Sequence, residues 1–345
     1  MSARKMGVSR PTVAILLIII VVVAAAGYLL YTGQHGKSNS PLIVYTADAY
    51  VAESQYLYGG FANSSGISYA PPKSGGSFAL ARQIAEGEPS SVFISVAKSA
   101  VTSSYLGNES SGWAIGFATD QLVLAYSGSP PEGIMSLYQA AVSTQSNTSW
   151  YNFFQALTSG SYKVGISDPN SDPAGLRAWL ALEAAGRLYA NDNQSYFVER
   201  LLNDHGNVTA PSAAELFAPL EAGQIQFLFV YKSAVISHSL QMMALPPYIN
   251  QGDPALASFY SSLTYDTSSG VQAGSPIILY ITVPKDSTDP ATSYAFVVWV
   301  VKHATTLSKF GLEPLSPSVL YNDSSVPQQL TRLLQGGFLV NGGTL

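Results

Sequence analysis

Three short stretches place small polar residues where an apolar strand passes through a loop into a helix. They are TADAY at residues 46–50, KSGGS at 73–77 and SDPAG at 171–175. A helix N-terminus carries free backbone N–H groups and a partial positive charge, so it can bind an anion. Ser, Asp and Gly also cap helices without any ligand. The three junctions therefore indicate either a shared anion site or three ordinary helix caps.

The remainder of the chain offers little chemistry of another kind. It contains no G-x-S-x-G nucleophile motif and no GxxxxGK[ST] phosphate loop. There is no Cys, and the four histidines lack the spacing of metal ligands. These are His35, His205, His238 and His303. We expect no enzymatic activity, no cofactor and no resident metal ion.

Short apolar runs alternate with helical patterns along the chain, which is typical of an α/β fold. Strands are predicted at residues 42–46, 66–69, 91–97, 120–126, 225–231 and 276–283. Helices are predicted from about residue 50, at 78–86, 213–222 and 290–309, and at the end of the stretch 163–188, which reads as a short strand, a loop and a helix. The stretch PPKSGGS at 71–77 is expected to be a loop.

The two long strands at 120–126 and 276–283 bracket an α/β insert, which predicts two crossings between two lobes. The first lobe is expected to comprise residues 42–122 and 278–345, and the second residues 123–277. Ligands of open α/β sheets bind beyond the carboxyl ends of the strands. A binding cleft between the lobes is therefore expected.

The N-terminus predicts a location at the cell surface. Residues 12–31 carry no charge and follow Arg4, Lys5 and Arg10. A run of about 20 apolar residues is long enough to cross a bilayer, and preceding basic residues stay in the cytoplasm. We expect a transmembrane anchor or cleaved signal at 1–32, a linker at 33–41, and an extracellular remainder.

The composition fits an exposed protein. Six Asn-x-Ser/Thr sequons are potential glycosylation sites. They are Asn63, Asn108, Asn147, Asn193, Asn207 and Asn322. Only 11% of the residues are charged and the net charge is −5, so no basic surface is expected for nucleic acid. A lightly charged exterior also suggests an acidic external medium.

One motif resembles a known family. The pattern Gly-x-Ser-x-Pro-x-x-Asp-Pro-x-Gly-x-Arg is carried by Gly165, Ser167, Pro169, Asp172, Pro173, Gly175 and Arg177. Four further stretches agree in order: GGS at 75–77, FATDQLVLAYSG, EAGQIQFLFVYKSAV and GSPIILYITVPK. Over residues 42–335 the chain resembles the solute-binding proteins of archaeal molybdate/tungstate ABC transporters.

This resemblance implies a two-lobed periplasmic-binding-protein-like (type 2) fold. It also implies that the protein delivers an oxyanion to an ABC permease. We expect the protein to be a monomer. It implies that Asp172 and the amides of Ala174 and Gly175 face the ligand. In that family an Asp and a Glu oxygen complete a six-coordinate metal centre. The other candidate ligand-binding residues are Asp48, Ala49, Ser77, Ser95 and Tyr231.

The chain departs from the family at two places. Val230 stands where the family has the Glu ligand, and Asp48 and Ala49 stand where it has Gly-Ser. Three accounts follow: Asp48 replaces the missing Glu, or a tetrahedral oxyanion binds to amides and hydroxyls while Asp172 only caps its helix, or the ligand is not an oxyanion. An alternative function is a surface-layer-associated or adhesion protein that retains the fold without transport.

Overall fold

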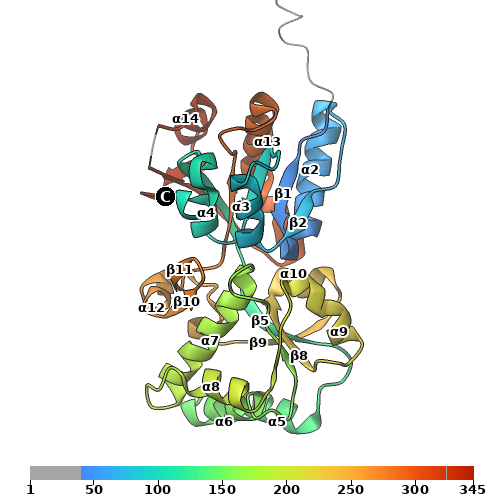
Figure 1. Ribbon diagram of the computed structural model, residues 1–345, viewed down its shortest axis with the longest axis vertical. Coiled ribbons are helices and arrows are strands. Elements are labelled where there is room, and N and C mark those ends of the chain that lie inside the picture. Colours follow the sequence, from blue (N-terminus) through green and yellow to red (C-terminus); the bar gives the residue numbers. More distant parts are fainter. Residues whose placement is uncertain (1–39, 324) are drawn as a thin grey trace, which may run out of the picture.

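The computed structural model describes residues 40–323 and 325–345. The predicted anchor at 1–32 and most of the predicted linker at 33–41 lie outside this part of the chain. Among the described residues, no helix is both long and apolar enough to span a membrane. The described chain forms two α/β lobes, one above the other (Figure 1).

The first lobe contains a seven-stranded mixed sheet with the order β14-β13-β4-β12-β3-β1-β2. Strand β1 pairs in parallel with β2 and β3, whereas β12 runs antiparallel to both β3 and β4. A central strand buried on both faces reads as a continuous apolar run, and β3 is buried at every position. The strands are β1 (Val44–Ala47), β2 (Lys73–Gly75), β3 (Val92–Ser95), β4 (Trp113–Thr119), β12 (Ile278–Thr282), β13 (Glu313–Asn322) and β14 (Leu339–Asn341). The α-helices are α2 (Val51–Ser65), α3 (Ser77–Ala85), α4 (Ser103–Leu106), α13 (Pro290–His303) and α14 (Gln328–Gln335).

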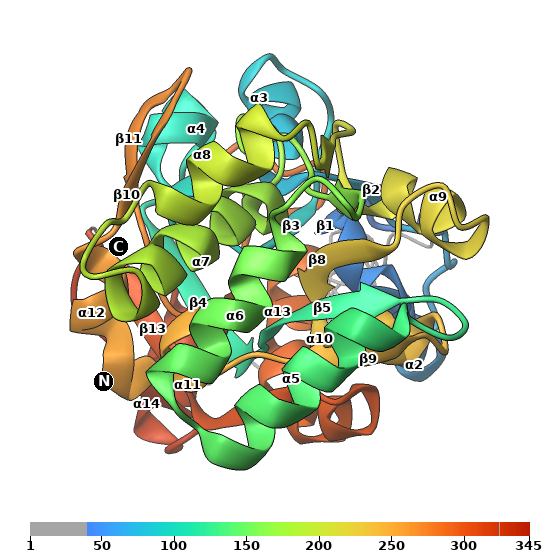
Figure 2. The same cartoon turned by 90° about the horizontal axis from the view of Figure 1, so that it is seen from below.

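The second lobe contains a five-stranded sheet with the order β7-β6-β8-β5-β9. Strand β8 pairs in parallel with β6 and antiparallel with β5. Seen from below, α5, α6 and α8 lie nearest the viewer (Figure 2). The strands are β5 (Leu122–Tyr126), β6 (Val164–Gly165), β7 (Asn207–Val208), β8 (Phe227–Tyr231) and β9 (Gln241–Ala244). The α-helices are α5 (Glu132–Thr144), α6 (Asn147–Leu157), α7 (Pro173–Tyr189), α8 (Tyr196–Asn203), α9 (Phe217–Glu221), α10 (Lys232–Ser237), α11 (Pro247–Asn250) and α12 (Ala257–Ser261).

Helix α6 shows how the sequence builds the core of the second lobe. Trp150, Phe153, Phe154 and Leu157 recur at the i, i+3, i+4, i+7 spacing of one helix face, and all four are buried. The Oγ of Ser146 caps the helix by accepting a hydrogen bond from the N–H at the third helical position. Burying each large side chain stabilises the fold by roughly 1.5–3 kcal/mol. This aromatic cluster gives α7 a rigid support, because Trp150 and Phe154 stack on its last turn.

The local structure differs from the sequence prediction in the first lobe. Residues 67–72 are irregular, so the strand predicted at 66–69 is wrong, and β2 lies in the stretch expected to be a loop. Its residues Lys-Ser-Gly have low strand propensity. The strand forms because β1 offers a free edge, with Tyr45 opposite Lys73. The hairpin of β10 (Thr264–Thr267) and β11 (Gly270–Ala273) was not predicted either.

The chain passes between the lobes at two adjacent segments. One lies between β4 and β5, and the other between β11 and β12. The N–H of Asp120 donates to the carbonyl of Ile277 (3.1 Å), which joins the segments side by side. The Asp120 carboxylate accepts hydrogen bonds from Tyr50 (3.1 Å) and Ser233 (2.5 Å), one from each lobe. Burial raises the pKa of Asp120 to about 6.

Candidate functional site

The three predicted junctions meet where the lobes touch. The N–H of Ala79 in α3 donates to the carbonyl of Ser171 (3.2 Å), and Arg82 donates to the carbonyl of Asn170 (2.7 Å). Figure 1 shows α3 of the upper lobe above the start of α7 in the lower lobe. The structure is therefore a closed form, and its first and second lobes are linked by direct hydrogen bonds.

Asp172 caps α7 and lies in this layer between the lobes. Its Oδ1 accepts from the N–H of Ala174 (3.0 Å) and its Oδ2 accepts from the N–H of Ala213 (2.8 Å). The side chain is 2% exposed. Burial and, next, the charge of Asp48 raise the pKa of Asp172 to about 7. In this closed form the Ala174 amide, predicted to face a ligand, is bound to the capping carboxylate.

Asp48 reaches the same layer from the first lobe. It belongs to the short 3₁₀ turn η1 (Asp48–Tyr50), and its Oδ1 accepts from the N–H of Ala49 (2.8 Å). Burial raises the pKa of Asp48, while the hydroxyl of Ser212 and the amide of Ala214 in the opposite lobe lower it in part. Asp48 and Asp172 form an acid pair across the interface. Two like charges in a buried layer disfavour joint ionisation of the pair.

The two candidate serines are buried beside the turn that follows β3. The Oγ of Ser77 accepts from the N–H of Val96 (3.3 Å). The Oγ of Ser95 both accepts from the N–H of Ala97 and donates to its carbonyl, each at 3.0 Å. Both side chains are inaccessible to solvent in this form. Their hydroxyls hold the loop that meets the second lobe.

Close packing explains why position 175 of the motif is a glycine. A Cβ at this position would lie 1.9 Å from the carbonyl oxygen of Ser167, two residues after β6 ends. Only glycine lets α7 approach the strand so closely. The same close approach brings the start of α7, with Asp172 and Ala174, to the interface between the lobes.

Arg177 is a site residue that the sequence reasoning did not assign. Its side chain is 4% exposed; Nη1 donates to the hydroxyl of Tyr231 (3.1 Å), and Nη2 donates across the interface to the carbonyl of Val96 (2.8 Å). Tyr231 stacks on Tyr50 of the first lobe with ring centroids 5.4 Å apart. None of the ion pairs in the described chain includes Arg177, and its Nε has no hydrogen-bond partner. A cation within the apolar helix run LRAWLALEAA was the signal that could have identified it.

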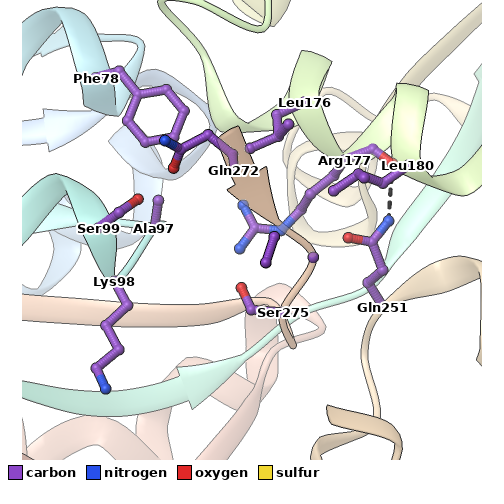
Figure 3. Close-up of a pocket in the computed structure, with 12 residues that line it drawn as sticks. Phe78, Ala97, Lys98, Ser99, Leu176, Arg177, Leu180, Gln251, Gln272 and Ser275 are labelled. Carbon is purple, nitrogen blue, oxygen red and sulfur yellow. Dashed lines mark hydrogen bonds between the residues drawn. The ribbon is translucent and has the colours of Figure 1, made fainter. Parts of the chain in front are cut away.

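A cavity of about 290 Å³ lies beside Arg177 between the lobes. Figure 3 shows Phe78, Gln272 and Leu176 along one side of the cavity, Ala97 facing the guanidinium, and Ser275 and Gln251 along the other side. The lining residues are Phe78, Ala97, Lys98, Ser99, Leu176, Arg177, Leu180, Gln251, Gln272, Ala273, Gly274 and Ser275.

The layer thus combines all the predicted site positions with one buried cation that forms no ion pair in the described chain. The predicted positions are Asp48, Ala49, Ser77, Ser95, Asp172, Ala174, Gly175 and Tyr231. Val230, which stands at the position of the family's Glu ligand, is buried in β8 opposite Val123. A two-lobed α/β protein with a cavity and an arginine between its lobes is typical of the solute-binding proteins, which close around a ligand.

Comparison with known proteins specifies the class. The family model of the bacterial extracellular solute-binding proteins matches residues 57–313, and the chain belongs to this family. A solute-binding protein of unassigned ligand from Sulfurisphaera tokodaii is 38% identical over 318 residues, which cover 89% of this chain and 84% of that protein. Another, from Saccharolobus solfataricus, is 38% identical over 319 residues and covers 89% and 79%.

Two solved structures share the fold. The periplasmic molybdate-binding protein of Azotobacter vinelandii superposes with a TM-score of 0.56 at 20% identity, covering 83% of this chain and 100% of that one. The sulfate-binding protein of Mycobacterium tuberculosis gives a TM-score of 0.53 at 16% identity, covering 88% and 93%. The predicted two-lobed α/β fold and the predicted class, a solute-binding protein of the ABC-transporter type, are confirmed.

Proposed function

We propose that the chain captures a small oxyanion between its lobes at the cell surface and delivers it to an ABC permease in the membrane. The observation that carries this proposal is Arg177, a buried cation with no carboxylate partner in the described chain. A buried charge without a counterion is costly. An anionic solute would supply the missing countercharge and would hold the lobes together.

The acid pair fits an anion site only when it is protonated. Two ionised carboxylates beside an oxyanion would repel it, whereas carboxylic acids can donate hydrogen bonds to it. Burial already raises the pKa values of Asp48 and Asp172. The proposal therefore includes tighter binding at acidic than at neutral pH.

The mechanism is hinge closure. A ligand that contacts both lobes binds the closed form more tightly and shifts the population toward it. The closed form brings Arg177 within 2.8 Å of the Val96 carbonyl in the first lobe, so the guanidinium joins both lobes around the ligand. The permease would recognise this closed form.

The acid pair also favours a second candidate, molybdate or tungstate held in a six-coordinate centre. Asp48 approaches Asp172 from the opposite lobe closely enough for its charge to raise the pKa of Asp172. Asp48 would then supply the carboxylate that Val230 lacks. In that case Asp48→Asn should weaken tungstate binding at least tenfold, whereas under the leading proposal it should leave the affinity equal or tighter.

Calorimetry on residues 41–345 with molybdate, tungstate, sulfate, thiosulfate and phosphate at pH 4 and pH 7 tests the leading proposal. Arg177→Met should weaken oxyanion binding by about 10- to 150-fold, because a hydrogen bond to a charged group contributes about 1.5–3 kcal/mol. Arg177→Lys should retain part of the affinity, since it keeps the charge. Arg187→Met, which removes a surface arginine of the same helix, serves as the control. Parent affinity in a folded Arg177→Met protein would contradict the proposal.

A further inference from the structure

The cavity beside Arg177 is larger than an inorganic oxyanion requires. Its volume is about 290 Å³. One water molecule occupies about 30 Å³ of liquid, and pockets for organic ligands begin near about 300 Å³. A five-atom oxyanion would leave most of this space to water, which would weaken every charge interaction in the site.

The walls of the cavity have two different chemistries. Phe78, Leu176 and Leu180 contribute apolar side chains that are buried. Gln251 and Ser275 contribute polar groups across from Phe78 and Leu176, and the amide of Gln272 lies beside Phe78 (Figure 3). An apolar wall offers no hydrogen bond to an inorganic oxyanion, but it favours contact with carbon. The cavity therefore suits a molecule that has both a carbon body and polar substituents.

Gln251 has an acceptor that is not used. Its side chain is 2% exposed, and Nε2 donates to the backbone carbonyl of Arg177 (2.8 Å). A carbonyl can only accept, so the amide nitrogen must face it and Oε1 must face the other way. Oε1 is buried and has no hydrogen-bond partner among residues 40–323 and 325–345. A buried acceptor of this kind calls for an O–H or N–H donor, which a fully ionised inorganic oxyanion lacks.

The positive charge at the cavity comes from Arg177. Lys98 also lies at the rim, but its Nζ donates to the carbonyl of Thr344 (2.7 Å) and sits 4.4 Å from the ring centroid of Tyr321. Figure 3 shows the Lys98 amine directed away from Arg177. An anionic group of the ligand would therefore pair with Arg177, and the remainder of the molecule would extend along the cavity.

We propose that the solute is an organic anion, in which an oxyanion group pairs with Arg177 and a carbon body bearing hydroxyl or amino groups fills the cavity and donates to Gln251. This inference rests on the proposed capture of an oxyanion and names the class of molecule that carries it. Phosphate monoesters, sulfonates and hydroxycarboxylates share this chemistry.

Calorimetry with matched pairs of anions tests the inference. The pairs are phosphate with glycerol 3-phosphate, sulfate with 2-hydroxyethanesulfonate, and acetate with glycerate, each measured at pH 4 and pH 7. The organic or hydroxylated member of at least one pair should bind tenfold or more tightly than its partner. Equal or tighter binding by the simpler member of every pair would overturn the inference and leave the oxyanion proposal intact. Absence of binding by every compound would overturn both.

Two variants locate the organic body. Ser275→Leu places a larger side chain in the cavity and should weaken the organic member at least tenfold while leaving its inorganic partner within twofold. Gln251→Met removes the free acceptor and should reduce the difference in affinity between the hydroxylated anion of a pair and its simpler partner. Ser258→Leu, an exposed position on α12, is the matched control. An unchanged preference in folded Ser275→Leu and Gln251→Met proteins would overturn the placement of the ligand in this cavity.

Discussion

Gly76 is the position at which a single methyl group should prevent closure of the lobes. It precedes α3 with φ −60° and ψ 134°, a conformation that alanine adopts without strain. A Cβ there would lie 2.3 Å from the carbonyl oxygen of Ser171 and 3.0 Å from the Cα of Asp172. Both atoms are backbone atoms of the opposite lobe, so no side-chain rotation can relieve the overlap. Gly76→Ala should leave each lobe folded and hold the two lobes apart.

The size of the effect follows from the contacts that closure forms at this point. Separation of the two lobes would break the hydrogen bonds from Ala79 to Ser171 (3.2 Å) and from Arg82 to Asn170 (2.7 Å). At about 0.5–1.5 kcal/mol each, their loss costs about 1–3 kcal/mol. Under the proposed hinge closure, in which the ligand binds the closed form, Gly76→Ala should weaken binding by about 5- to 150-fold.

Small-angle scattering and calorimetry together test this prediction. The parent should become more compact on addition of its tightest-binding anion, whereas Gly76→Ala should retain the radius of gyration of the open form. Gly59→Ala is the control, because a Cβ at that helical position meets nothing within 4 Å. The reasoning is refuted if Gly76→Ala compacts on ligand addition and binds with the parent affinity.

Three further predictions concern stability and local packing. Burial raises the pKa of Asp172 to about 7 from 3.8, so its stabilising contribution is complete below pH 3.8 and is lost as the pH rises through 7. Asp172→Asn, which preserves the cap, should flatten the melting temperature between pH 4 and pH 7; an unchanged slope would contradict this. Ser77→Ala removes the acceptor for the Val96 N–H and should lower the unfolding free energy by about 1 kcal/mol or more, as measured by urea titration. An unchanged unfolding free energy would argue against this hydrogen bond. Gly175→Ala forces a Cβ to 1.9 Å from the Ser167 carbonyl oxygen and should lower the melting temperature by several degrees, which differential scanning fluorimetry would detect or exclude.

The sequence alone determined the features that depend on neighbours along the chain. Asp172 before Pro173 predicts the start of α7, and the spacing of Trp150, Phe153 and Phe154 suits one buried face of α6. Short-range periodicity and caps reflect interactions within a few residues, so strands and helices can be predicted from them. The order of these strands and helices along the chain predicted two α/β lobes. The motif that ends at Arg177 indicated a solute-binding protein, because its residues lie close together in the sequence and can be recognised without the fold.

Only the tertiary structure decided how these parts meet. Strand β2 exists because β1 offers it an edge, although its own residues have little tendency to form a strand. Asp48 and Asp172 are far apart in sequence, and their charges interact only because the lobes close. Within the described residues, Arg177 has no carboxylate partner and Gln251 has a free acceptor beside it, because of the way the two lobes position their backbones. Such long-range juxtapositions depend on packing between distant segments, which no local pattern of residues encodes.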